Sequence, residues 1–168
     1  MGCVMQPLNS PIELGLRCVV LLTSLFPRRA DISRLVLMDH CLLHSADLGG
    51  PDSVLPPIPA RGGELGIKRT VVEHGLRVMM RAGMVEAHAS EAGLEYAASE
   101  EAESFLGVLE SSHLRHLIAS ASWVVEEFGD QDESAIRDRV GEVLDRWSED
   151  LEPIEIVNES LLGQEDER

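Results

Sequence analysis

Hydrophobic and polar positions follow three helical repeats and then a two-residue repeat along the first hundred residues. Apolar side chains recur three or four positions apart in 11–26, 32–46 and 65–80, which predicts three amphipathic helices. In 84–99, apolar and polar residues alternate on either side of Gly93, which predicts a β-hairpin. Three helices followed by a hairpin is the element order of a winged helix-turn-helix unit.

Capping signals place the ends of these helices. Ser10-Pro11-Ile12-Glu13 reads as a capping box with proline in the first turn, so the first helix should begin near Pro11. Pro27 should end it. Asp31 is expected to cap the second helix, and Ala82-Gly83 to close the third.

The second half of the chain returns to helix. Apolar residues cover a broad arc over 100–128, which predicts a helix that packs on two sides, and a narrower stripe follows over 136–147. We therefore expect a mainly α protein with a winged helix-turn-helix unit in 1–99, a helical extension in 100–147 and an acidic tail in 148–168. Disorder is the default expectation for such a tail, and a docking segment is the alternative.

One carboxylate interrupts the apolar face of the second helix. On a helical wheel Asp39 falls among the apolar side chains, where an unpaired carboxylate would cost several kcal/mol. It therefore needs a partner. Arg17 of the first helix and a backbone amide of the following loop are the two candidates.

The stretch MDHCLLHSADLGGP, residues 38–51, raises the question of a metal site. His40 and His44 are one helical turn apart and could share a metal, which would make the protein a small metalloenzyme. However, Cys41 should project away from the apolar stripe, and no second cluster supplies further ligands. The competing interpretation is architectural: Asp39, His44, Asp47 and Glu64 form a polar hinge that holds the proline-rich loop 49–63 in one shape.

Charge is unevenly distributed. Residues 1–85 carry 9 Lys+Arg and 7 Asp+Glu, whereas 86–168 carry 5 and 23, giving the total of -16. Any nucleic-acid contact must therefore be local and lie in the first half. Three cysteines without CxxC spacing indicate the reducing cytoplasm, and the apolar run 12–26 is too short and too charged to cross a bilayer.

Sequence motifs for catalysis are missing. There is no nucleophile elbow and no HExxH, and the glycine-rich run 62–70 lacks the Walker spacing. Ser45 beside His44 and Ser112 beside His113 are chain neighbours whose side chains diverge on a helix. We therefore expect a protein that is not an enzyme and that needs no cofactor or metal.

The third helix offers cations for a partner or for DNA, namely Lys68, Arg69, Arg77 and Arg81. The hairpin carries Glu86, Glu91 and Glu95 without a lysine or arginine, and carboxylates repel phosphates. Weak or indirect DNA contact through the third helix stays open. A surface that binds protein fits the charges better.

Several segments together resemble a known family. NSPIELGLRCVVLLTSLFP, DISRLVLMDHCLLHSADLGGP, the P-x-R-x-G-E-L run at 59–65 and VVEHGLRVMMRAGMVE are similar to the middle component of bacterial ABC-three-component conflict systems, which are anti-phage operons related to Lamassu. The resemblance covers residues 9–128.

The resemblance implies an accessory subunit of a defence complex. Such a subunit would dock on an SMC-like ABC ATPase and link it to an effector encoded in the same operon. It also marks Asp39, His44, Asp47 and Glu64 as positions of the family pattern, and Arg61 and Arg69 as further ones. In this interpretation the hinge presents Arg61 and the start of the third helix to the partner. The alternative is a winged-helix transcription regulator that binds DNA.

Overall fold

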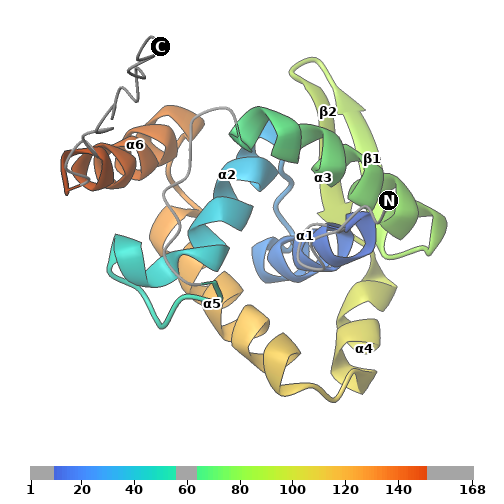
Figure 1. The fold of residues 1–168 in the computed structure, drawn as a ribbon. Coiled ribbons are helices and arrows are strands. Elements are labelled where there is room, and N and C mark those ends of the chain that lie inside the picture. Colours follow the sequence, from blue (N-terminus) through green and yellow to red (C-terminus); the bar gives the residue numbers. More distant parts are fainter. Residues whose placement is uncertain (1–9, 56–63, 151–168) are drawn as a thin grey trace, which may run out of the picture.

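The computed structural model describes residues 10–55 and 64–150, except for the side chains of 64–67, 144 and 146–150. Helices dominate, and one two-stranded antiparallel hairpin lies between the third and fourth α-helices (Figure 1). The elements are α1 (Pro11–Leu25), α2 (Ile32–Leu43), the short 3-10 helix η2 (Ser45–Leu48), α3 (Glu64–Arg81), β1 (Val85–Ser90), β2 (Gly93–Ala98), α4 (Glu100–Val108), α5 (Ser112–Phe128) and α6 (Glu133–Asp150). The predicted order of three helices and a hairpin is confirmed.

Helix α1 begins and ends where its sequence signals predict. The Ser10 side chain accepts a hydrogen bond from the Glu13 backbone N–H at 3.2 Å, and Pro11 occupies the first turn. Helix α2 is capped in the same way by Asp31, which accepts from the Arg34 N–H at 2.8 Å. Both caps satisfy amides that have no partner within the helix.

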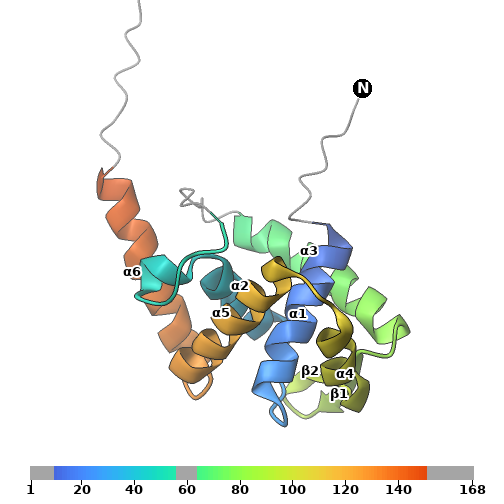
Figure 2. The same ribbon diagram turned by 90° about the horizontal axis from the view of Figure 1, so that it is seen from below.

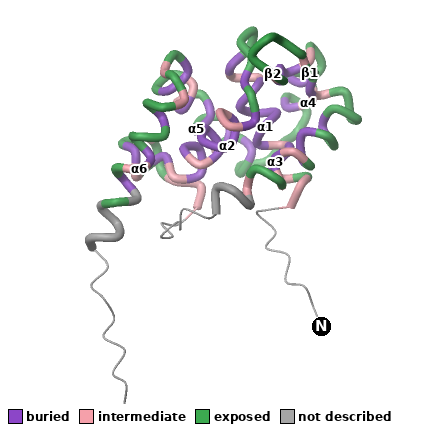
Figure 3. The backbone as a smooth tube through the Cα atoms, turned by 90° about the horizontal axis from the view of Figure 1, so that it is seen from above, coloured by how far each residue is buried: buried purple, intermediate pink, exposed green. Residues whose placement is uncertain are grey.

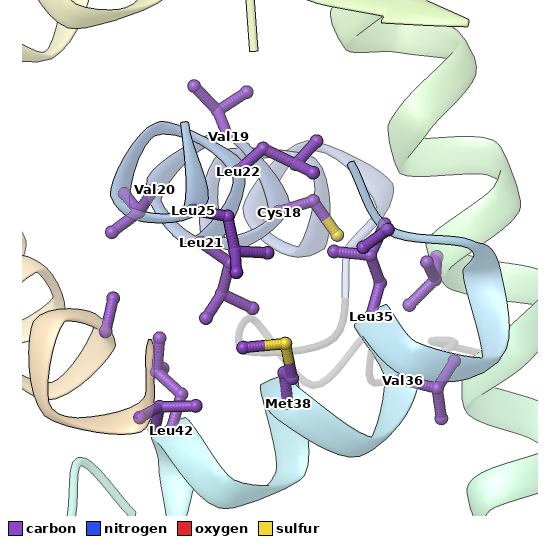
Figure 4. Packing of buried hydrophobic residues seen from close by; sticks show 14 of the residues in the cluster. Cys18, Val19, Val20, Leu21, Leu22, Leu25, Leu35, Val36, Met38 and Leu42 are labelled. Carbon is purple, nitrogen blue, oxygen red and sulfur yellow. The ribbon is translucent and has the colours of Figure 1, made fainter. Parts of the chain in front are cut away.

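The core is built around α1. Figure 2 shows α1 in the middle of the molecule, with α2, α5 and α6 on one side and α3, α4 and the hairpin on the other. Buried positions concentrate on α1 and α2, whereas the outer helices keep exposed faces (Figure 3). The side chains that fill the space between α1 and α2 are mostly aliphatic (Figure 4), among them Cys18, Leu21, Leu25, Leu35, Met38 and Leu42.

Two glycines let α1 and α3 approach closely. A Cβ atom on Gly75 would lie 2.6 Å from the Pro11 carbonyl oxygen and 2.7 Å from the Gly15 nitrogen. A Cβ on Gly15 would lie 2.8 Å from the Gly75 carbonyl oxygen. The backbones of the two helices are therefore in direct contact at this point, and any larger side chain would separate them.

The hairpin is joined to the helical core through its second strand. Strands β1 and β2 pair in the register Val85↔Ala98, Ala87↔Tyr96 and Ser90↔Gly93, and Gly93 adopts φ +122° after the turn. Tyr96 also exchanges two backbone hydrogen bonds with Ala30, which lies between α1 and α2, at 2.8 and 3.0 Å. The predicted hairpin and its turn are confirmed.

Two expectations for the helices are wrong. Residues 100–128 form two helices and not one. Helical structure is interrupted at 109–111, and Ser111 caps α5 by accepting a hydrogen bond from the Leu114 N–H at 3.4 Å. Cys41 does not project away from the core: it is fully buried, as are Leu37 and Met38, so α2 is covered around most of its circumference.

The hydrophobic core continues across the boundary predicted at residue 99. Leu117, Ala121 and Val124 of α5 belong to the same buried cluster as α1 and α2. Ile136 and Val140 of α6 join it as well. The residues 151–168 of the predicted acidic tail lie outside the described residues.

Candidate functional site

A cluster of charged side chains surrounds Asp39, inside the core between α1, α2 and α3. Arg17 grips this carboxylate with two hydrogen bonds, from Nε to Oδ1 at 2.6 Å and from Nη2 to Oδ2 at 3.1 Å. Lys68 Nζ lies 2.7 Å from Asp39 Oδ2. Arg17 and Asp39 are fully buried. The predicted Arg17 partner of Asp39 is therefore confirmed, and Lys68 is a second partner that the sequence did not indicate.

The cluster extends outward through Glu13. Its Oε1 lies 3.9 Å from Arg17 Nη1 and 3.6 Å from His113 Nε2 of α5. Two cations, Arg17 and Lys68, thus meet two carboxylates, Asp39 and Glu13. This balance allows charged groups to remain in an interior that would otherwise disfavour them.

The neighbouring cations favour the ionised form of Asp39. Burial by itself raises the pKa of Asp39, but the charges of Lys68 and Arg17 outweigh burial and lower it to about 2. Burial raises the pKa of the Cys18 thiol as well, and that of Cys41 to about 12. Because reactive cysteines need an accessible thiolate, these two thiols have the character of core side chains.

The two histidines of the 38–51 stretch contact each other without forming a metal centre. Their ring centroids are 4.8 Å apart and the ring planes are tilted by 41°. Burial, reinforced by the charge of Lys68, lowers the pKa of His40 to about 3, so this ring is neutral at physiological pH. Within 10–55 and 64–150, no group of three or more His, Cys, Asp or Glu side chains is arranged to hold a metal.

Hydrogen bonds fix the described part of the loop after α2. Ser45 Oγ donates to the Pro51 carbonyl at 3.0 Å, and the Ala46 N–H donates to Ser53 Oγ at 3.0 Å. His116 Nε2 of α5 lies 2.8 Å from the Asp52 carbonyl oxygen. His44 Nδ1 is 4.0 Å from Asp47 Oδ2. Serine hydroxyls and His116 thus hold this loop, whereas the sequence predicted a hinge of Asp39, His44, Asp47 and Glu64.

The remaining members of the predicted hinge lie elsewhere. Asp39 belongs to the ion cluster in the core, not to the loop. Glu64 is the first residue of α3, and its side chain is outside the description. Arg61 also falls outside the described residues.

The predicted cations of α3 divide into two groups. Lys68 turns inward to Asp39, with only 14% of its side chain exposed. Arg69, Arg77 and Arg81 are exposed, and Arg69 Nη1 donates to Ser33 Oγ of α2 at 2.7 Å. The structure therefore brings three of the four α3 cations to the surface and uses the fourth to fix the start of the helix.

Arg34 joins α2 to the end of α5. Its guanidinium donates to the carbonyls of Phe128 at 3.1 Å, Gly129 at 2.7 Å and Gln131 at 2.8 Å. Phe128 is the last residue of α5, and Gly129 and Gln131 follow it in the turn before α6, so Arg34 holds this turn against α2. This role could not be predicted from the sequence, because no local signal relates Arg34 to residues almost a hundred positions away.

A groove of about 910 Å³ lies beside this junction, between the turn after α1, the hairpin tip and the turn before α6. Its charged lining includes Arg28, Arg29, Asp31 and Asp132. Arg28 Nη1 is 2.6 Å from Asp130 Oδ1. The lining holds no serine, cysteine or histidine, so it lacks a nucleophile and base pair of the usual kinds.

Comparison with known proteins decides the family. The model of the ABC-three component (ABC-3C) system Middle Component 2 family matches residues 7–150. The chain belongs to this family. The resemblance seen in the sequence is thus confirmed, and the match extends beyond it to include α6.

An ABC-3C middle component is, by its family description, one part of a multi-component system. Neither the curated proteins nor the solved structures gave a significant match. In the described part of the chain, no helix has the length and apolar character needed to cross a membrane. The family match includes both the three-helix and hairpin unit and α4 to α6, which agrees with their shared core.

Proposed function

We propose that this protein is a non-enzymatic accessory subunit of an anti-phage defence system, which docks on an SMC-like ABC ATPase in the cytoplasm and links it to an effector. The observation that carries the proposal is the family match over residues 7–150, because the family is defined as the middle component of an ABC system. A middle component has at least two neighbours to contact, and binding is the function that such a position requires.

The chemistry of the described residues supports a binding role over a catalytic one. The main charged cluster, around Asp39, is enclosed in the core and ties three helices together. The two described thiols are buried. A catalytic site needs several groups that converge on an accessible pocket.

We further propose that the first unit is a winged helix-turn-helix used for protein contact. Helices α1 to α3 precede a hairpin in the order of that motif, and Ala30 adds a third extended segment beside β2. The exposed arginines of α3 favour a second candidate, a DNA-binding regulator, because α3 corresponds in order to the helix that reads the major groove.

Co-expression with the ATPase and effector genes of the same operon tests the proposal. The tagged chain should retain the ATPase through size-exclusion chromatography at physiological salt, and the purified chain alone should not hydrolyse ATP. ATP turnover by the isolated chain would refute the non-enzymatic role. Tight, sequence-selective binding to its own promoter, without any binding to the ATPase, would favour the regulator.

A further inference from the structure

Helix α3 has two faces of opposite character. One face packs into the core through Val72, Gly75, Leu76 and Met79, which are all buried. The other carries Arg69, Arg77 and Arg81, which spread over an arc of about 120° with Glu73 between Arg69 and Arg77. Among the α3 side chains that the structure describes, Glu73 is the one carboxylate. The outer face is therefore locally positive on a protein whose total charge is -16.

These arginines are available to a partner. Within 10–55 and 64–150, no hydrogen bond or ion pair engages the guanidinium of Arg77 or Arg81, and Arg69 shares only a hydroxyl, that of Ser33. Arg34 shows the contrast, because three carbonyls occupy its guanidinium. An unoccupied guanidinium on a fixed helix can grip a carboxylate with two parallel hydrogen bonds.

The hairpin adds apolar surface beside these cations. Tyr96 lies near α3: burial and the charge of Glu73 raise its pKa, whereas Arg77 and Arg69 lower it. Because side chains alternate along a strand, Leu94 shares the face of Tyr96, whereas Glu86 and Glu95 belong to the opposite face. Leu94 is 50% exposed. The hairpin face that includes Tyr96 thus carries the exposed Leu94, and not Glu86 or Glu95.

Helix α3 itself contributes further apolar area. Met80 is 38% exposed and lies on the arc of the arginines. We define the α3–hairpin face as the exposed surface formed by Arg69, Arg77, Met80, Arg81 and Leu94. Arginine and methionine are enriched in protein interfaces, where apolar side chains lie at the centre and charges at the edge.

We propose that the α3–hairpin face is the docking surface for the ABC ATPase subunit of the same system, at a patch of that subunit where carboxylates surround apolar side chains. This inference rests on the proposed function and names the surface through which it acts. The carboxylates would pair with Arg77 and Arg81, and the apolar side chains would cover Met80 and Leu94.

The same face is a poor match for DNA. A duplex gripped by α3 would also bring phosphates to the hairpin, which carries no lysine or arginine and has Glu91 in its turn. Phosphates also provide no cover for exposed apolar side chains. A protein partner satisfies the cations and the apolar area together.

Charge reversal on the full-length chain tests the proposal. The variant Arg77→Glu/Arg81→Glu should bind the purified ATPase subunit about ten-fold more weakly or worse in a calorimetric titration, since each exposed arginine loses an attraction and gains a repulsion. The control Arg115→Glu/Arg139→Glu makes the same change in net charge at exposed positions of α5 and α6, and should bind as the wild type does. A third variant, Leu94→Asp, should weaken binding without removing a cation.

The outcomes separate the surface from the function. Equal affinities for the wild type and the Arg77/Arg81 variant would overturn the docking surface but leave the accessory role intact. A wild-type chain that does not bind the ATPase would remove both. Binding of a duplex of about 30 base pairs at physiological salt, lost in the Arg77/Arg81 variant and kept in the control, would assign the face to DNA instead.

Discussion

Replacing Asp39 with alanine should destabilise the protein by roughly 3 kcal/mol, because it leaves the buried Arg17 guanidinium without its carboxylate. Arg17 is fully buried, and both Arg17 and Lys68 contact Asp39 at or below 3.1 Å. Breaking a buried pair costs about 3–5 kcal/mol. The lower end applies here because Glu13 still lies 3.9 Å from Arg17, and because Lys68 is near enough to the surface to reach water.

Urea unfolding followed by far-UV circular dichroism measures this loss. At an unchanged slope, the midpoint should fall in proportion to the lost stability. In a thermal melt, the same loss corresponds to about 6–12 °C in Tm for a chain of this length. Glu103→Ala, which removes an exposed carboxylate from α4, serves as the control and should change stability by less than about 0.5 kcal/mol.

A triple variant distinguishes the cost of an unpaired charge from the value of the cluster. Arg17→Met/Asp39→Leu/Lys68→Met replaces every buried charge with an apolar side chain of similar size. Its stability should lie within about 2 kcal/mol of the wild type, since exchanging a whole buried ion cluster is often neutral or stabilising. A triple variant less stable than Asp39→Ala, or an Asp39→Ala loss below about 1 kcal/mol, would refute this reasoning.

Three further predictions follow from the described geometry. Gly75→Ala should lower the free energy of unfolding in urea by about 1–3 kcal/mol, because the added methyl group forces α1 away from α3. Gly141→Ala, whose Cβ meets open space, should stabilise α6 slightly, and equal effects of the two changes would contradict the close helix contact. Because the pKa of Asp39 is lowered to about 2, its contribution of about 2 kcal/mol is present above pH 4 and is lost as the pH falls from about 4 to 2; the difference between wild type and Asp39→Asn should shrink over that range in pH-dependent melts. Because the pKa of His40 is lowered from 6.5 to about 3, the unfolded chain binds a proton at His40 at a higher pH than the folded chain does, so the free energy of unfolding should fall as the pH drops below 6.5. His40→Gln should flatten this pH dependence, and an unchanged slope would contradict the neutral buried ring.

Local signals in the sequence were sufficient for the helices that carry their own caps. Ser10 and Asp31 cap α1 and α2 as predicted, and the alternation around Gly93 located the hairpin. The same type of reasoning failed at 109–111, because apolar residues continue on both sides of the break and the cap at Ser111 resembles any exposed serine. Periodicity shows which residues avoid water, and it does not show whether one helix or two present them.

Of the long-range contacts in the core, one could be predicted from the sequence and two could not. The need of Asp39 for a cation could be predicted because a carboxylate stood on an apolar face, and Arg17 lay on the neighbouring helix. Lys68 could not be predicted as the second partner of Asp39, since the loop that returns the chain to Asp39 carries no periodic signal. The contact between Gly15 and Gly75 was also hidden, because glycine gives no hydrophobic signal on a helical wheel.

The most direct test of the connecting role is to reconstitute the three components with and without this chain. The ATPase and effector subunits are mixed at micromolar concentration, and the masses of the complexes are measured by sedimentation. We predict that the effector sediments with the ATPase only when this chain is present, and that the Arg77→Glu/Arg81→Glu variant fails to bring them together. Effector and ATPase that associate equally well without the chain would contradict the account.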